Sequence, residues 1–546
     1  MVGADKVVLT DVERKLVCGD PSTEGWARVP LNEARYFLES FLQQRGFQNP
    51  KFQFKAGRLL VDVGAQSRIR SLGVKGLPQG IDPSKLRKID GETMTPQQLN
   101  KIKSTLLNAL QNQGYACPKI EISADAQTGD VLADVDKGLL YIVDDIIPAR
   151  LTGIDPAIFN RYEAFERGKR FDMRLLTLTA ERTLVDSLFI SAYYDVACAT
   201  GGAMSITQRV IEGKPQLYRA GVGFDTEGYA IGKAQWSNSR IGMRVSSLEG
   251  SLYLSYREQT AETSARYYLN PSSRLHLRPR LYFRRQNEIQ FESFDSQGSV
   301  MPATSWENQA LRVDLAAGPA LERVETLRGA GPPIDTFFSV NTQMTFTDHL
   351  FEYYAGEPRS GWKTSFETSS RVNGVYSSLT AHRVSIQGET LWNLGDYDPP
   401  LFVVGTRYWA GTIYVNDHAA ALQLLPPDAR FFLGGDANLR GAARKEVPAD
   451  DIGFLTAAYD GLELRLGDVA YGVQPLLFLD AAMAGRTSVH LDRDVYWSPG
   501  AGFRWRLPIG SIRGTLARGI LWRREAVALP LYKPHWQFFF SFGKEF

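Results

Sequence analysis

The stretch HWQFFFSFGKEF, residues 535–546, decides the fold class of this chain of 546 residues. Successive side chains of an extended strand point to opposite faces of a sheet. Only Lys544 interrupts the aromatic face of this strand, which holds Trp536, Phe538, Phe540, Phe542 and Phe546. A strand face of this kind aggregates when it meets water. It must therefore be covered by protein or by lipid.

The stretch RLHLRPRLYFRR, residues 274–285, alternates in the same way. Its apolar face holds Leu275, Leu277, Pro279, Leu281 and Phe283. Its opposite face holds the arginines Arg274, Arg278, Arg280 and Arg284. In a soluble sandwich the arginines would meet bulk water, whereas in a membrane barrel they would line a wet lumen and the apolar face would meet lipid. Similar alternation recurs at 402–415, 461–466 and 502–507, and the terminal aromatic face favours the barrel.

Composition excludes several classes of protein. Lys and Arg total 62 against 60 Asp and Glu, so no global charge favours nucleic-acid binding. Mean hydropathy is slightly negative, and the absence of about 18 uninterrupted apolar residues excludes a membrane protein built of helices. The first residues, MVGADKVVLTDVER, hold no basic region followed by an apolar stretch. We therefore expect either a cytosolic chain or one whose leader has been removed.

The N-terminal part repeats one pattern three times. A helix-like stretch ends at a small residue, an aromatic residue follows, and strand-like residues come next. The small residues lie at positions 46, 114 and 192, separated by 68 (114 − 46) and 78 (192 − 114) residues. In the second copy, Thr95 suits the N-cap, Pro96 the first helical position and Gln98 a capping box. Repeats of this size predict small α/β units.

A change in composition near residue 214 separates these repeats from a second region. We predict an atypical first unit at residues 1–65, further units at 66–141 and 142–213, and a barrel at 214–546. The 332 residues after position 214 (546 − 214) suit 16 strands at roughly 20 residues per strand and connection, an even number as single-chain bacterial barrels require. We expect the polar stretch at 290–309 to form an extracellular loop.

Several motifs occur together along the chain. GVGFDTEG at 221–228 resembles a first barrel strand, and RFFLGGDANLRG at 430–441 resembles a loop-six signature. FLDAAMAG at 478–485 and GFRWRLPIGSIRG at 502–514 resemble two later strand motifs. The terminal stretch resembles a C-terminal β-signal formed by Phe538, Phe540, Phe542 and Phe546. In this order, the motifs resemble those of the BamA/TamA superfamily of outer-membrane assembly proteins, and most closely its TamA branch.

The resemblance covers most of the chain and implies its architecture and location. The fold would consist of α+β periplasmic POTRA repeats followed by a 16-stranded antiparallel transmembrane β-barrel. The barrel would lie in the bacterial outer membrane, with the repeats in the periplasm. The chain departs from the family pattern at three positions, because Ala442 replaces an aromatic residue, Ala482 a glycine and Leu507 a serine.

The resemblance also implies that the loop at 430–441 folds back into the lumen, where a charged side chain needs partners. Asp480 lies opposite in parity to Leu477 and Leu479, and Glu463 lies opposite in parity to Leu462 and Leu464. Both carboxylates are therefore predicted to face the lumen. Because the arginine fork suits a carboxylate, we predict that Arg440 pairs with Asp480, with Glu463 as the second candidate. The other members of the predicted loop site are Arg430, Gly434, Gly435 and Gly441.

A second predicted site is the seam between the first and last barrel strands. Glycines weaken a strand and favour bending, which predicts a short pairing between Val222–Phe224 and Phe540–Phe542. The residues of this predicted seam are Gly221, Val222, Gly223, Phe224, Phe540, Phe542 and Gly543. In this family such a seam acts as a lateral gate, at which a client strand adds to the exposed edge. The alternative is that the glycines only relieve the curvature of the barrel.

The sequence favours an assembly factor over an enzyme. It contains no H-E-x-x-H, G-x-S-x-G or G-x-x-x-x-G-K-[ST] motif, and we expect no cofactor and no metal. Cys18, Cys117 and Cys198 lack zinc spacing, and which of them pair stays open.

The resemblance implies a factor that inserts β-barrel or autotransporter-type proteins by strand templating. Its implied partners are unfolded outer-membrane protein clients, a TamB-like protein anchored in the inner membrane, and outer-membrane lipids. The edges at Lys119–Ser123 or Val131–Val135 are predicted to pair with clients or with that partner. The main alternative is a TpsB-type two-partner secretion transporter that exports a polypeptide through the lumen. A patatin-type enzyme carrier and a role in lipid transport or surface structure are further alternatives.

Overall fold

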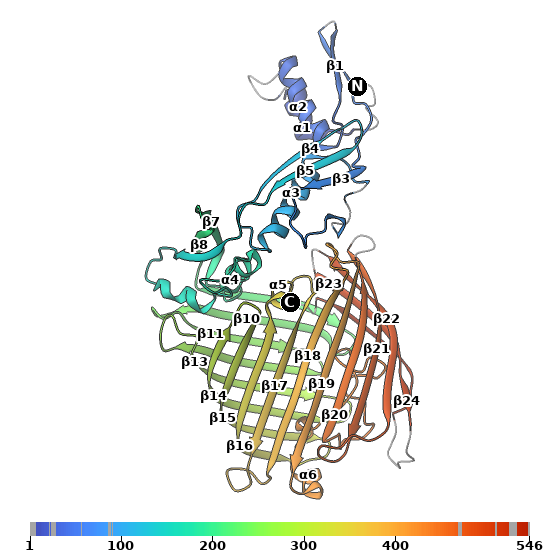
Figure 1. The fold of residues 1–546 in the computed structure, drawn as a ribbon. Coiled ribbons are helices and arrows are strands. Elements are labelled where there is room, and N and C mark those ends of the chain that lie inside the picture. Colours follow the sequence, from blue (N-terminus) through green and yellow to red (C-terminus); the bar gives the residue numbers. More distant parts are fainter. Residues whose placement is uncertain are drawn as a thin grey trace.

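The computed structural model places a series of small α/β units above one end of a large barrel (Figure 1). It describes residues 7–20, 22, 29–55, 57–85, 89, 91–467, 472–507, 510–523 and 532–543. In this part of the chain, no helix combines the length and the apolar character needed to cross a bilayer.

The first unit is built of two helices and one hairpin. It consists of α1 (Asp11–Cys18), α2 (Leu31–Gln44), β1 (Lys51–Lys55) and β2 (Arg58–Asp62). Thr10 and Glu13 close a capping box at the start of α1, which satisfies two otherwise unpaired backbone N–H groups. Leu38 and Leu42 of α2 pack into the core with Val61. The described residues give this unit a two-stranded sheet, whereas the next two units have three strands each.

The second and third units share one topology. The second contains β3 (Ser71–Lys75), η2 (Pro83–Lys85), α3 (Pro96–Gln111), β4 (Lys119–Ala124) and β5 (Asp130–Asp136). The third contains β6 (Ile142–Ile147), η3 (Pro156–Arg161), α4 (Met173–Val185), β7 (Phe189–Cys198) and β8 (Ala203–Glu212). The sheet orders are β3-β5-β4 and β6-β8-β7. The prediction that Val131–Val135 offers a free edge is wrong, because β5 is the central strand, whereas β4 does lie at an edge.

Helix α3 of the second unit begins with the N-cap residue and the proline that its sequence predicts. The Thr95 side chain accepts a hydrogen bond from the Gln98 N–H at 3.1 Å, and Pro96 occupies the first turn. The buried face of α3 carries Ile102, Leu106 and Leu110 at helical spacing. These residues pack with the inward-facing residues of β4 and β5, so the helix is held against its sheet by apolar burial.

A disulfide joins the second and third units. Cys117 follows α3, and Cys198, at the end of β7, lies 81 residues further along the chain. The same junction carries a backbone hydrogen bond of 3.0 Å from the Tyr141 N–H to the Gly114 carbonyl. Cys18 is exposed and free.

We expect Cys117→Ser to loosen this junction. A disulfide that closes a loop of this length contributes roughly 4 kcal/mol in the chain-entropy account, and only the noncovalent contacts of the junction remain after its loss. Hydrogen exchange in the full chain should accelerate at least several-fold in β6 and β7. Cys18→Ser is the matched control and should leave exchange unchanged. Equal exchange in the two variants would show that the noncovalent contacts alone fix the junction.

The barrel is closed by antiparallel pairing throughout. Its first strands are β9 (Gln216–Asp225), β10 (Tyr229–Ile241), β11 (Ser246–Leu254), β12 (Glu258–Tyr268), β13 (His276–Asn287), β14 (Glu292–Glu307), β15 (Leu311–Arg328) and β16 (Ile334–Asp348). The remaining segments are β17 (Gly361–Arg371), β18 (Ala381–Leu394), β19 (Phe402–Val415), β20 (Thr456–Leu466), β21 (Val473–Gly485), β22 (Val495–Leu507), β23 (Gly510–Arg518), β24 (Ile520–Trp522) and β25 (Trp536–Phe542). Both β23 and β24 pair with β22 and count as one strand. The seventeen segments therefore form 16 strands (17 − 1), which confirms the predicted barrel.

The predicted extracellular loop at 290–309 is wrong. Its residues form β14, which pairs with β13 and β15 along most of its length. The strands β14, β15 and β16 have 16, 18 and 15 residues, more than the roughly 9–11 that a tilted strand needs to cross a bilayer. Asp295 and Gln297 line the lumen, whereas Phe294 and Val300 lie on the opposite face of the strand. The polar composition of this segment therefore reflects its lumenal face and does not indicate a loop.

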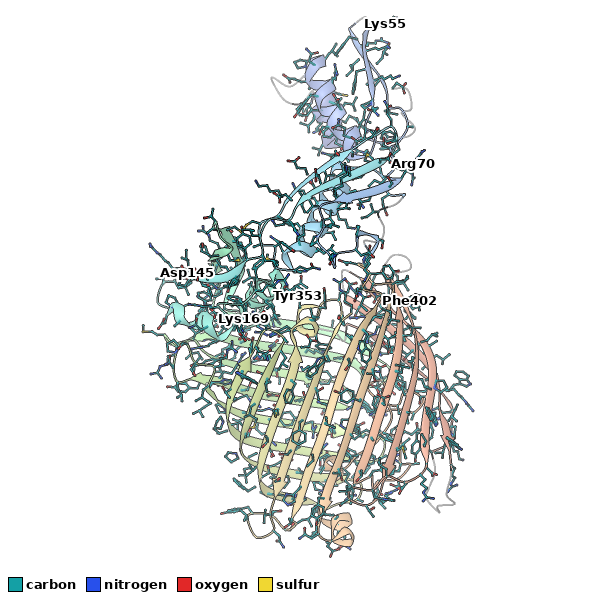
Figure 2. The ribbon with its side chains drawn as sticks, in the orientation of Figure 1. Lys55, Arg70, Asp145, Lys169, Tyr353 and Phe402 are labelled. Carbon is teal, nitrogen blue, oxygen red and sulfur yellow. A yellow bond between two sulfur atoms is a disulfide. The ribbon has the colours of Figure 1, made fainter. Side chains whose placement is uncertain are left out.

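The third unit is fixed to the barrel rim by buried ion pairs. Arg182 of α4 contacts Glu307 at 2.7 Å and Glu352 at 2.6 Å, and its side chain is only 6% exposed. Glu352 belongs to α5 (His349–Tyr353), whose last residue is labelled at the rim in Figure 2. Burial lowers the pKa of Arg182, but the two carboxylates outweigh this effect and raise the pKa above its ordinary value. The guanidinium therefore stays charged, and it depends on both partners.

We expect Arg182→Met to release the third unit from the rim. The substitution leaves Glu307 and Glu352 without their shared cation, and removing one partner of a buried pair costs roughly 3–5 kcal/mol. Limited proteolysis of the full chain should become faster near α4. Arg209→Met removes an exposed pair with Asp195 and should have little effect. Equal proteolysis of the two variants would contradict a role for Arg182 in docking.

Candidate functional site

The connection between β19 and β20 folds back into the barrel. It contains α6 (His418–Leu424) and η4 (Pro427–Ala429), and α6 lies at the barrel end far from the N-terminal units (Figure 1). Two short antiparallel bridges, Phe431 with Phe454 and Leu433 with Val447, close the returning segment. These four side chains belong to one buried apolar cluster shared with the barrel wall. The segment 430–441, named the lumenal loop below, is therefore packed as a core.

Arg440 is the charged centre of the lumenal loop. Its Nε and Nη2 donate to the two oxygens of Asp480 at 2.9 and 2.7 Å, and its Nη1 donates to Glu463 at 2.8 Å. Its backbone N–H also donates to Asp480, at 3.0 Å. The guanidinium lies 3.4 Å from the ring centroid of Phe478. Arg440 and Asp480 are fully buried, so the loop is pinned by a desolvated ion pair with bidentate geometry.

Both carboxylates occupy adjacent strands that turn the same face to the lumen. Glu463 of β20 pairs in register with Phe478 of β21, and Gly461 pairs with Asp480. A Cβ atom at position 461 would lie 2.9 Å from a carboxylate oxygen of Asp480 and still closer to the Tyr459 hydroxyl. Tyr459 donates to Asp480 at 3.1 Å. The glycine therefore makes room for the acceptor of Arg440.

The glycines of the lumenal loop serve two different purposes. Gly434 and Gly435 have φ values of +112° and +115°, a region that favours glycine. Gly441 instead permits close approach, because a Cβ there would lie 2.5 Å from the Ser498 hydroxyl and 2.6 Å from the Cα of Gly519. The loop tip thus lies directly against β22 and against the interruption between β23 and β24.

Ala442 is fully buried although it lacks the aromatic ring of the family pattern. It shares its apolar cluster with Tyr496 and Tyr532, whose rings lie 6.4 Å apart. The hydroxyl of Tyr532 donates to the Gly441 carbonyl. Aromatic packing at the loop tip is therefore supplied from the wall of the barrel and from the approach to β25, and it adds to the ion pair.

Arg430 holds the base of the loop and contacts main-chain carbonyls. It donates to the carbonyls of Ile452 and Leu425 at 2.9 and 2.6 Å. These bonds tie the beginning of the lumenal loop to the segments that follow and precede it.

Among the described residues, the seam between β9 and β25 is the shortest strand pairing that closes the barrel wall. It contains two residue pairs, Phe224 with Phe542 and Asp225 with Ser541, whereas β9 and β10 share ten pairs. Thr226 adds two hydrogen bonds to Phe540, of 3.0 and 3.2 Å. Along the rest of β9, residues 216–223 have no strand partner on the seam side within the described chain.

The predicted seam residues take different places in this arrangement. The predicted pairing of Val222 with the stretch Phe540–Phe542 is wrong, because the register places Phe224 opposite Phe542 and Val222 beyond it. Val222 is 80% exposed, and the described part of β25 overlaps β9 only where β9 ends. Gly221 lies beside Val222 on the unpaired part of β9. At Gly223 a Cβ would lie 2.7 Å from the Phe542 carbonyl, so the crossing of the two chains requires glycine there.

The terminal aromatic row faces outward as its alternation predicts. Trp536 and Phe538 are 63% and 51% exposed, while Phe540 lies nearer the seam, 6.5 Å from the ring of Phe224. Gly543 follows β25 with a φ of +66°. Phe546 of the predicted β-signal lies outside the described residues, as does Lys544.

The lumenal loop also contacts the elements that flank the seam. The Asp436 N–H donates to Glu227, in the turn after β9, at 3.0 Å. Across the seam, Tyr532 contacts the loop through Gly441. Sequence reasoning missed Glu227 and Tyr532, because their partners lie 209 and 91 residues away. The loop therefore touches the chain on both sides of the seam and couples the two candidate sites.

Comparison with known proteins agrees with this architecture. The Omp85 superfamily domain matches residues 211–546. A BamA structure from Haemophilus ducreyi lacking POTRA domains 1–3 is similar at a TM-score of 0.52 and 14% identity, covering 87% of this chain and 99% of that one. CdiB from Acinetobacter baumannii aligns at a TM-score of 0.48 and 15% identity, covering 98% of this chain and 99% of that one.

Proposed function

This chain belongs to the Omp85 superfamily, and it is an outer-membrane β-barrel protein whose N-terminal repeats lie in the periplasm. We propose that it inserts β-barrel or autotransporter-type proteins into the outer membrane. Client strands add to the free edge of β9 at the seam. The observation that carries the proposal is the seam itself, which has two residue pairs where the neighbouring pairing of β9 has ten. The closer likeness to the TamA branch rests on the sequence motifs.

The unpaired edge of β9 has a physical reason to bind a strand. Backbone N–H and C=O groups left unsatisfied in the hydrocarbon region each cost several kcal/mol. Within the described chain, residues 216–223 have no strand partner for their backbone groups on the seam side of β9. A client strand that pairs with them satisfies its own backbone and that of β9 together. Main-chain recognition of this kind tolerates many client sequences.

The lumenal loop would hold the seam until a client arrives. It contacts Glu227 on one side of the seam and the segment leading into β25 on the other. Separation of β9 from β25 therefore strains or breaks one of these contacts. We propose that Arg440, anchored on Asp480 and Glu463, keeps the loop in place while the seam opens.

The periplasmic units would receive clients and a partner protein. The edge strand β4 has no neighbour on its outer side within the described chain, so it offers a second site for strand addition. A TamB-like protein anchored in the inner membrane is the partner proposed for this edge, and outer-membrane lipids surround the seam. No catalytic step and no cofactor enters the proposal.

The proposed function is tested by depletion of this protein followed by proteomics of the outer membrane. We expect selective loss of particular β-barrel or autotransporter-type proteins, restored by the wild-type chain. In the matched complementation, the depleted cells receive the chain that carries Phe224→Cys and Phe542→Cys across the seam. Loss of one secreted protein from otherwise normal membranes would contradict insertion and favour a TpsB-type transporter that exports through the lumen.

A further inference from the structure

A cavity of about 610 Å³ lies in the lumen between the wall strands β17–β20 and the lumenal loop. Its charged lining is strongly unbalanced, with two carboxylates, Asp428 and Glu389, against six cations: Arg284, Lys363, Arg383, Arg407, Arg430 and Lys445. The formal charge of the lining is therefore +4 (6 − 2), and one of these cations, Lys445, is paired with Glu288 just outside the lining at 3.5 Å. Its volume lies within the roughly 300–1,000 Å³ typical of ligand-binding clefts.

The two carboxylates are already engaged by arginines. Asp428 lies 3.5 Å from Arg284, and Glu389 lies 3.4 Å from Arg465. Three of the lining cations have no carboxylate within 4.0 Å in the described chain: Lys363, Arg383 and Arg407. The guanidinium of Arg383 lies 5.0 Å from the ring centroid of Phe431. Cations in a confined site are costly when they lack a counter-charge, so this cavity favours an anionic occupant.

The excess of positive charge is smaller in the adjoining part of the lumen, which shares Arg284, Arg383 and Asp428 with this cavity. A neighbouring lumenal cavity of about 460 Å³ carries five arginines against four carboxylates, a formal charge of +1 (5 − 4). Two of its arginines are directly paired, Arg371 with Asp335 at 2.5 Å and Arg280 with Glu262 at 2.7 Å. The larger cavity therefore has a greater excess of positive charge than the neighbouring lumenal cavity of the same protein.

The position of the cavity indicates from which side an anionic ligand would reach it. Phe351 of α5 lines the cavity, and α5 lies at the rim that faces the periplasmic units (Figure 1). The lumenal loop forms the opposite boundary through Ala437 and Asn438. The cavity therefore lies between the periplasmic mouth and the loop, on the side from which an unfolded client would arrive.

We propose that this cavity binds an acidic, unfolded segment of a client polypeptide. The arginine forks pair with carboxylates, and the aromatic walls of Tyr408, Trp409 and Phe432 offer contact area to an extended chain. Only the identity of the ligand as a client rests on the proposed function. The cavity would select clients by their charge, whereas strand pairing at the seam depends only on the main chain of the client.

The proposal is tested by peptide binding to the full chain in detergent micelles. The probes are a labelled glutamate-rich peptide and a lysine-rich peptide of equal length, with inorganic pyrophosphate as a competitor. The test variant combines Lys363→Gln, Arg383→Gln and Arg407→Gln, none of which strands a carboxylate. The control is Arg278→Gln, which lines the neighbouring cavity and contacts Gln343. Unchanged electrophoretic mobility of the unheated barrel verifies that each variant is folded.

We expect the wild type to bind the acidic peptide and the triple variant to bind it at least about tenfold more weakly, with the control unchanged. Added salt should weaken binding, because it screens the charges. Equal binding by the triple variant, preference for the basic peptide, or binding of pyrophosphate without binding of peptide would each overturn the proposal. Client insertion is measured separately by the seam experiment below, so a failure of the cavity and a failure of the seam are distinguishable.

Discussion

Oxidation of a chain that carries Phe224→Cys and Phe542→Cys is expected to abolish client insertion. These residues face each other in the seam, and directly opposed residues of antiparallel strands lie about 4.5–5.5 Å apart at Cα, within reach of a disulfide. The bond would tie β9 to β25 and prevent a client from entering between them. Insertion into proteoliposomes should fall by at least about tenfold, a factor that corresponds to roughly 1.4 kcal/mol.

The matched control ties two strands away from the seam. Thr263 and Leu281 are register partners on β12 and β13, and Thr263→Cys with Leu281→Cys forms the same bond within the continuous wall. This variant should insert clients normally under oxidising conditions. A reductant should restore insertion by the seam variant. Normal insertion by the oxidised seam variant would mean that clients do not enter between β9 and β25.

Asp480→Asn is expected to release the lumenal loop. The substitution preserves shape but removes the charge that Arg440 contacts through two side-chain donors and its backbone N–H. Breaking a buried pair costs roughly 3–5 kcal/mol when the remaining charge has no other partner, and the retained contact of Arg440 with Glu463 places the expected cost at the lower end of this range. Protease cleavage within 430–441 should increase strongly, and the folded barrel should unfold at a lower temperature. Arg440→Lys should weaken the loop less, because it retains the charge but loses the fork.

An exposed pair provides the control for this prediction. Arg323 contacts Glu325 at 2.8 Å with both side chains largely accessible, so Arg323→Gln should change stability by less than about 1 kcal/mol. The charge exchange Arg440→Asp with Asp480→Arg should not rescue the loop, because Glu463 would then lie beside a new carboxylate. Full rescue by the exchange would show that Glu463 contributes nothing to the anchor.

Strand parity carries much of what the sequence predicts about the barrel. Glu463 and Asp480 alternate with leucines, and both carboxylates lie on the lumenal side beside Arg440. Alternation is informative here because one face meets lipid and the other meets water. The same alternation is present in β14, where Asp295 and Gln297 line the lumen and Phe294 and Val300 lie on the other face, so the wrong loop prediction came from overall polarity and not from parity. The prediction that the loop folds into the lumen rests on the family resemblance, because no local sequence pattern distinguishes a buried loop from an exposed one.

Contacts that depend on closure of the barrel could not be predicted. The bond between Glu227 and Asp436 joins residues 209 positions apart, and it exists only because the loop returns to the seam. The register that places Phe224 and not Val222 opposite Phe542 is likewise set by the whole wall. The pairing of Cys117 with Cys198 follows from how two units meet, and spacing alone allows three choices among three cysteines.

Cross-linking of a client during insertion tests the central claim most directly. Cysteines are placed singly along the free edge of β9, at Tyr218, Ala220 and Val222, and a client strand carries one cysteine near its end. The account predicts disulfides between each β9 cysteine and the client. Because the two strands would be antiparallel, moving the cysteine toward the C-terminus of β9 should move the cross-linked client position toward the N-terminus of the client strand. A control cysteine at Thr406 of β19 should give none. Client cross-links at lumenal Arg407→Cys, with none along β9, would contradict insertion through the seam.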